Sequence, residues 1–121
     1  MSNKISILFD SFYLYHLPQF EPLIDLLAAD KRFLIYHSTS TEISKKEFRL
    51  CRSILKKKPG LFIEANSESA RQKKIRDLDL DVFICGWSRY DLNRYVSPKT
   101  LVVMIYHGIG IKPSYWLDNH E

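Results

Sequence analysis

The sequence predicts an α/β domain built on a parallel β-sheet, and two observations support that prediction. Short apolar segments alternate with segments of helical periodicity along all 121 residues, and this alternation implies right-handed crossovers between parallel strands. The strands expected at 4–9, 81–86 and 101–106 are also nearly continuous apolar runs, which is typical of strands covered by helices on both faces. We therefore predict a three-layer, Rossmann-like domain whose five-stranded sheet has the order 3-2-1-4-5.

The N-terminal half of the chain accounts for two strands and two helices. Residues 4–9 predict the first strand, and residues 17–29 predict a helix because their apolar side chains recur at helical spacing. The second strand is expected at 33–37. Residues 38–41, Ser-Thr-Ser-Thr, are expected to form a loop and to cap a helix that runs from about 42 to 57.

The C-terminal half is expected to continue the alternation. A third strand is predicted at 61–65, a polar helix at 67–78 and a fourth strand at 81–86. Residues 87–99 lack a long helical pattern and are expected to form a loop with a short helical turn. The fifth strand, 101–106, is the most apolar run of the chain. The basic residues of the polar helix are expected on a solvated surface: Arg71, Lys73, Lys74 and Arg76.

Length and composition limit the class of protein. The 121 residues fit one domain, and no stretch approaches the roughly 20 apolar residues that a membrane span needs. The first residues lack the long apolar region of a secretory signal, so we expect a cytoplasmic protein.

Cys51 and Cys85 fall in apolar patterns and are expected in the core. The net charge of +4 favours anionic partners.

The segments that follow the strands are the places to look for a ligand site. In open parallel sheets, ligands bind beyond the carboxyl ends of the strands, near the point where the strand order reverses. Neither a glycine-rich dinucleotide turn nor a P-loop pattern occurs. We expect His16 to line the cleft just before the first helix; the alternative is that it packs over the strand end with its aromatic neighbours. Ser88, after the fourth strand, is a candidate for binding an anionic group.

The most specific pattern follows the fifth strand. His107 comes where the apolar run ends, and Gly108 and Gly110 remove side chains around it, so a ligand could approach the backbone. Lys112 adds a cation before a proline that fits the first turn of a helix, whose N-terminus favours anions. Because an imidazole titrates near neutral pH, it suits proton abstraction from a hydroxyl. The alternative is a glycine turn beside a structural histidine.

Two segments of the chain resemble a known family. Residues 81–87 and 101–112 are similar to the N-terminal Rossmann half of the CDP-glycerol glycerophosphotransferases, which build teichoic-acid-type polymers and have the two-domain B-type glycosyltransferase fold. That family carries a strand-end His-Gly followed by a Lys four positions after the Gly. His107, Gly108 and Lys112 match this pattern, whereas Ile-Gly-Ile replaces the family's usual Thr-Pro-Leu between the Gly and the Lys.

The resemblance implies a function and assigns roles to residues. Residues 1–121 would form the acceptor-side domain of a transferase that moves glycerophosphate or a sugar from a CDP-glycerol-like donor to a hydroxyl acceptor in cell-surface polymer synthesis. His107 would be the general base, Lys112 would position an anion, and His16 would line the acceptor cleft. The donor domain would lie beyond Glu121, so these residues alone would be inactive.

A second interpretation comes from another class of protein. The chain would then be a non-catalytic binding module for a phosphorylated small molecule or a protein partner. One helix face carries four basic residues that would either contact the anionic inner face of the cell membrane or be solvated: Lys45, Arg49, Arg52 and Lys56.

Nucleic-acid binding is not indicated, because the aromatic residues lie away from the basic helices. No cofactor motif occurs, and the histidines and cysteines show no metal-ligand spacing.

Overall fold

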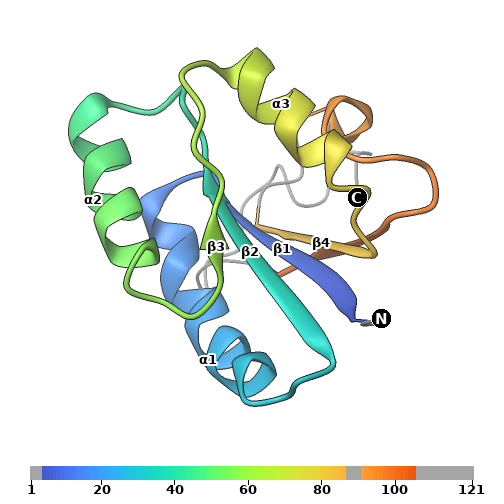
Figure 1. Cartoon of the computed structure of the whole chain (residues 1–121). Helices are drawn as coiled ribbons and strands as arrows, with labels where there is room; N and C mark the ends of the chain where they lie inside the picture. Colours follow the sequence, from blue (N-terminus) through green and yellow to red (C-terminus); the bar gives the residue numbers. More distant parts are fainter. Residues whose placement is uncertain (1–3, 87–90, 106–121) are drawn as a thin grey trace, which may run out of the picture.

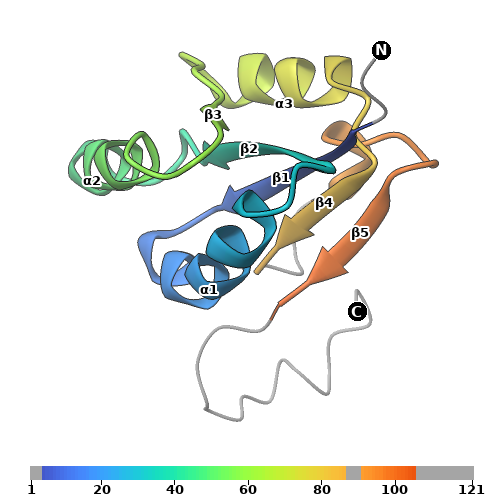
Figure 2. The same ribbon diagram turned by 60° about the horizontal axis from the view of Figure 1, so that its bottom comes forward.

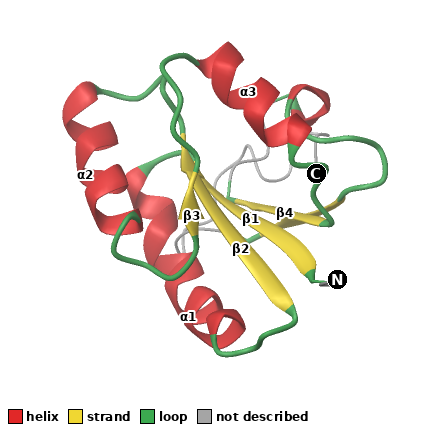
Figure 3. Ribbon diagram, in the orientation of Figure 1, coloured by secondary structure: helices red, strands yellow, loops and turns green. Residues whose placement is uncertain are grey.

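The computed structural model describes residues 4–86 and 91–105. Within these ranges, five strands form a single sheet in the order β3-β2-β1-β4-β5, and all four neighbouring pairs are parallel. Helices alternate with the strands along the chain (Figure 3). The predicted fold class, the parallel pairing and the strand order are therefore confirmed.

The elements have the following bounds, with η1 and η2 denoting short 3-10 helices. In chain order they are β1 (Ile5–Ser11), η1 (Leu14–His16), α1 (Leu17–Ala28), β2 (Phe33–Thr39), α2 (Lys45–Leu55), β3 (Leu61–Phe62), α3 (Glu68–Asp77), β4 (Val82–Cys85), η2 (Leu92–Arg94) and β5 (Leu101–Met104).

The second strand is longer than the sequence predicts, and the loop expected at 38–41 is shorter. Ser38 and Thr39 belong to β2 because they continue its parallel pairing with the end of β1. The cap of α2 is Ser44, whose hydroxyl accepts a hydrogen bond from the backbone N–H of Glu47 at 3.1 Å. The expectation that residues 38–41 supply the cap is therefore wrong: a polar Ser-Thr sequence extends the strand here instead.

The sheet lies between two layers of helix (Figures 1 and 2). Phe20 and Ile24 of α1 pack on Phe9 and its neighbours, and α2 adds Cys51 and Leu55 on the same face. On the opposite face, α3 packs with Leu8 and Phe83 in a second cluster. The three-layer arrangement is thus as expected. The two cysteines are both buried core residues, as predicted: Cys51 and Cys85.

The edge strand β5 departs from the expectation that it is covered on both faces. Leu101 is 61% exposed, and residues 102–105 are only half-buried. Pairing nevertheless continues beyond the strand, because the N–H of Ile105 donates to the carbonyl oxygen of Cys85 at 2.8 Å. This backbone hydrogen bond fixes the relative positions of the ends of β4 and β5.

Candidate functional site

The carboxyl ends of β1, β4 and β5 meet at the point where the strand order reverses. β1 pairs with both β2 and β4, so the chain crosses over in opposite directions on its two sides. Gly86 directly follows β4, and the carbonyl oxygen of Ile105 lies close to it. This corner is where the general rule for open parallel sheets places a ligand.

His16 forms part of this corner, and it is buried. The residue has no solvent exposure, and a Cβ atom added to Gly86 would lie 3.1 Å from its ring carbon Cδ2. The backbone N–H of Tyr13 donates to Nδ1 at 3.3 Å, so the proton of the neutral ring is on Nε2. The structure thus places His16 at the expected end of the sheet, with its ring packed beneath the surface. A side chain at position 86 would therefore crowd this ring, which would have to shift by a few tenths of an ångström.

The aromatic side chains after β1 form a continuous cluster around this histidine. The rings of Tyr13 and Tyr15 stack with centroids 5.4 Å apart, and Tyr15 meets the His16 ring edge-on at 4.7 Å. Phe12 contacts Tyr13 at 5.1 Å. Tyr15 is 46% exposed, whereas Phe12 is buried. The His16 ring is therefore packed among these side chains, as in the alternative interpretation that it covers the strand end, while Tyr15 reaches the surface.

A buried ionic network lies on the other side of β1. The Arg71 guanidinium pairs with Asp10 at 2.5 Å, and the two side chains are 1% and 0% exposed. Arg71 also pairs with Glu68, one turn earlier on α3. Ser38 donates to Asp10 at 2.8 Å, and the hydroxyl of Tyr95 donates to Glu68 at 2.6 Å. The network joins β1, β2, α3 and the turn after η2.

The ionisation of this network follows from its contacts. Burial alone would raise the pKa of Glu68, but the hydrogen bonds and charge of Arg71 and the bonds from Tyr95 and Thr41 outweigh it and lower that pKa to about 2. Burial and the bond to Glu68 raise the pKa of Tyr95 to about 12. For Arg71, the charges of Asp10 and Glu68 outweigh burial and raise the pKa. The ion pairs are therefore intact at neutral pH.

Sequence reasoning missed this network. Arg71 was expected on a solvated helix surface with Lys73, but it is buried, whereas Lys73 is exposed in an ion pair with Asp77. The available signals were Asp10, a carboxylate at the end of an apolar strand, and Glu68, three residues before Arg71. Residues three apart on a helix lie on one face, but the pattern does not reveal that this face points inward.

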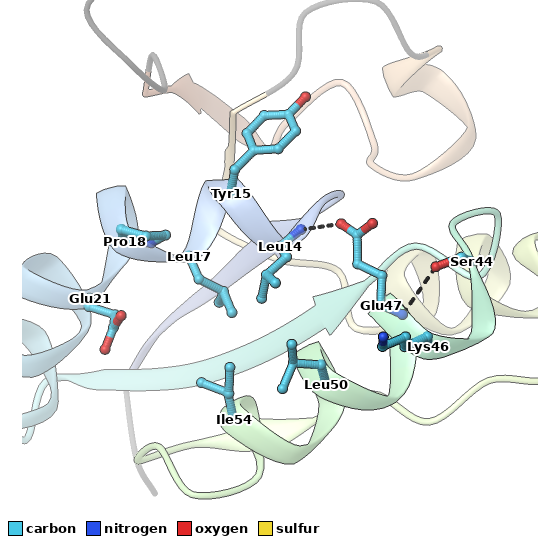
Figure 4. Close-up of a pocket in the computed structure, with 10 residues that line it drawn as sticks. All are labelled: Leu14, Tyr15, Leu17, Pro18, Glu21, Ser44, Lys46, Glu47, Leu50 and Ile54. Atoms are coloured by element: carbon cyan, nitrogen blue, oxygen red, sulfur yellow. Dashed lines mark hydrogen bonds between the residues drawn. The ribbon is translucent and has the colours of Figure 1, made fainter.

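An apolar groove of about 600 Å³ runs between the first turns of η1 and α1 and helix α2 (Figure 4). Leu14 and Leu17 face Leu50 and Ile54 across it. The backbone N–H of Leu14 donates to the Glu47 carboxylate at 2.7 Å, which ties the segment after β1 to α2. The groove is therefore adjacent to the aromatic cluster, with Tyr15 at its border.

The basic face of α2 divides into two parts. Arg52 and Lys56 both pair with Glu64, at 2.5 and 3.1 Å. Lys45 and Arg49 are exposed. The four residues thus lie along α2 and its C-cap, as predicted, but the single carboxylate of Glu64, which follows β3, offsets one of their four positive charges.

Several predicted site residues lie outside the ranges that the structure describes. They are Ser88, His107, Gly108, Gly110 and Lys112. Among the residues of the two described ranges, no group of three or more His, Cys, Asp or Glu side chains is placed to hold a metal ion. In the same part of the chain, no helix combines the length and apolar character that crossing a membrane requires.

Comparisons with known proteins yield no family: no protein-family model matches the chain, and neither the curated proteins nor the solved structures contain a significant match.

Proposed function

We propose that this domain is the acceptor-side half of a transferase that moves glycerophosphate or a sugar from a nucleotide-activated, CDP-glycerol-like donor to a hydroxyl acceptor. The observation that supports the proposal is the contact of His16 with Gly86 beside the carbonyl of Ile105, at the strand-order reversal. His107 follows Ile105 by two residues.

The proposed roles follow from chemistry and burial. His107 acts as the general base on the acceptor hydroxyl, a role that suits histidine because an unperturbed imidazole group takes up a proton near neutral pH. Lys112 positions an anionic group, while Gly108 and Gly110 let the acceptor approach the backbone. The buried ring of His16 forms the floor of the acceptor cleft. In this proposal His16 acts through packing, and it is a positioning residue.

The proposed location of the reaction is the cytoplasmic face of the cell membrane. Lys45 and Arg49 are exposed and supply the positive charge for contact with anionic lipid. Arg52 and Lys56 contribute less, because Glu64 pairs with both and offsets one of their two charges. The donor would be bound by a second domain.

The test is a donor screen with the full-length protein, using CDP-glycerol, CDP-ribitol and UDP- and GDP-sugars. Replacing His107 with Ala should lower kcat by about 10²- to 10⁴-fold, the usual contribution of general-base catalysis. His120→Ala, which removes a histidine with no proposed role, is the matched control and should keep full activity. A loss of less than about tenfold for His107→Ala would exclude His107 as the base. The absence of transfer from every donor would instead favour a non-catalytic binding module.

A further inference from the structure

Helix α2 carries three cations that form no salt bridge with a described residue, and two of them share one face of the helix. Lys45 and Arg49 lie one turn apart on one face of the helix, and both are exposed. Neither forms a salt bridge with a described residue, in contrast to Arg52 and Lys56 further along the same helix. Two like charges at this spacing repel each other, so their placement favours a position for an anion between them.

These two cations border a hollow at the carboxyl ends of β2 and β3. The hollow has a volume of about 280 Å³, with Phe48 and Ile43 supplying apolar surface and Asn66 supplying an amide. An adjoining hollow of about 370 Å³ shares Phe48 and Asn66 and reaches α3. In Figure 1 the segment after β3 rises past α2 towards α3, and Asn66 lies on that segment.

The carboxylates near this hollow are already engaged elsewhere. Glu64 accepts hydrogen bonds from Arg52 and Lys56. Glu68 is bound by Arg71 and by the backbone N–H of Thr41. Both carboxylates therefore already have cationic partners, which weakens their repulsion of an anion in the hollow.

A third cation lies on the far wall of the adjoining hollow. Lys74 lines it and is anchored by a 2.5 Å hydrogen bond from Nζ to the backbone oxygen of Glu64. An anion seated near Asn66 would thus lie between cations from α2 and α3.

We propose that this hollow binds a small phosphomonoester with an apolar or planar body. The guanidinium of Arg49 offers two parallel N–H donors that match two phosphate oxygens, and Lys45 adds a point charge. Phe48 and Ile43 would pack on the rest of the ligand. The position obeys the rule that ligands bind beyond the carboxyl ends of parallel strands, and the volume is at the small end of ligand pockets. This inference does not depend on the transfer reaction proposed above, but it assigns Lys45 and Arg49 to a soluble ligand in place of the lipid contact proposed there.

The experiment is an NMR titration of the 121-residue chain with phenyl phosphate and, in parallel, with inorganic phosphate. Saturable amide shifts should concentrate at Lys45, Arg49 and Asn66, and phenyl phosphate should bind more tightly than inorganic phosphate. The double variant Lys45→Gln/Arg49→Gln should weaken binding of phenyl phosphate by about tenfold or more. The control Lys57→Gln removes an exposed lysine outside the hollow and should leave the Kd unchanged.

A third arm distinguishes a free phosphate ester from a lipid headgroup. The chain is mixed with vesicles that contain phosphatidylserine, with and without phenyl phosphate. If the double variant loses vesicle binding while phenyl phosphate shows no saturable binding, the face contacts membrane and the proposal is wrong. Non-saturating shifts spread over all exposed lysines would also overturn it, as would equal binding by the double variant and the unmodified chain.

Discussion

Asp10 and Arg71 form an ion pair in which neither side chain is more than 1% exposed. They are separated by 61 positions in the sequence and join the carboxyl end of β1 to α3. The guanidinium also lies 5.9 Å from the ring centre of Phe12 and 5.0 Å from that of Tyr95. A single side chain thus links the sheet, a helix and the aromatic segment after β1.

Removing the positive partner of this pair should be strongly destabilising. Arg71→Met would remove the ionic partner of the buried Asp10 carboxylate and of the largely buried Glu68 carboxylate, and breaking a buried pair in this way costs about 3–5 kcal/mol. Urea denaturation gives the free energy of unfolding. Lys73→Met breaks the exposed pair with Asp77 and serves as the control, with an expected loss below about 1 kcal/mol. Equal effects of the two substitutions would show that the buried network does not stabilise the fold.

The stability of the domain should fall in mild acid because of His37. Burial is the main cause of the lowered pKa of this residue, and it outweighs the hydrogen bond to the carbonyl of Pro59. Its Nε2 lies 2.6 Å from that oxygen and must carry the proton, while Nδ1 has no hydrogen-bond partner among the described residues. Protonation of Nδ1 would therefore bury a charge without a partner.

The sign of this effect follows from linkage. Since the pKa of His37 is lower in the folded state than its ordinary value of 6.5, the unfolded chain takes up the proton first. The contribution of the neutral His37 ring to the free energy of unfolding is complete above pH 6.5. It is lost as the pH falls below that value, by at most about 1.4 kcal/mol per pH unit. Unfolding free energies at pH 7.5, 6.5 and 5.5 should show this slope. In His37→Gln the slope should be smaller; an unchanged slope would assign it to other groups.

Gly60 should tolerate no side chain. Its φ angle is +114°, and an added Cβ would lie 2.7 Å from the backbone oxygen of Ile35 and 2.9 Å from Nε2 of His37. Gly60→Ala should therefore destabilise the fold by more than about 1 kcal/mol, measured by thermal unfolding. Ser53→Ala, on the exposed side of α2, is the control and should change stability by less than about 0.5 kcal/mol.

Two leucines of α2 should respond differently to truncation. Leu55 is 1% exposed and packs with Leu17 and Cys51, whereas Leu50 is 48% exposed on the wall of the apolar groove. Leu55→Ala should cost about 2–5 kcal/mol, while Leu50→Ala should cost less than about 1 kcal/mol. Chemical denaturation of both variants provides the comparison. A large loss at Leu50 would indicate that the groove wall is buried in solution.

The sequence predicted the structure best where buried apolar side chains form a continuous run or recur at helical spacing. The apolar runs at β1, β4 and β5 and the helical spacing of Phe20 and Ile24 were sufficient to predict the parallel sheet and its order. Boundaries were less predictable: Ser38 and Thr39 look like a loop, but pairing with β1 keeps them in the strand. The local preferences of Ser and Thr do not reveal this pairing, because it depends on a strand that is distant in the sequence.

The polar parts of the site were harder to predict for a related reason. Arg71 and Lys73 are both basic residues on a polar helix, yet one is buried and the other exposed. What distinguishes them is the position of Asp10 and Glu68 in three dimensions, which a linear pattern does not contain. His16 was predicted at the correct sheet end, but its burial depends on Gly86 and therefore on the pairing of β1 with β4.

The buried carboxylate of Asp10 also protects the domain against a misaligned sheet. Side chains alternate between the two faces of a strand, so a slip of β1 by one residue would exchange its faces. Phe9 or Ser11 would then face the guanidinium of Arg71, which would lose Asp10 and keep only Glu68 as a carboxylate partner. Exchanging one apolar contact for another would cost little, whereas the loss of an ionic partner inside the protein is costly. The Asp10–Arg71 pair therefore favours one alignment of β1 among those that its apolar residues alone would permit.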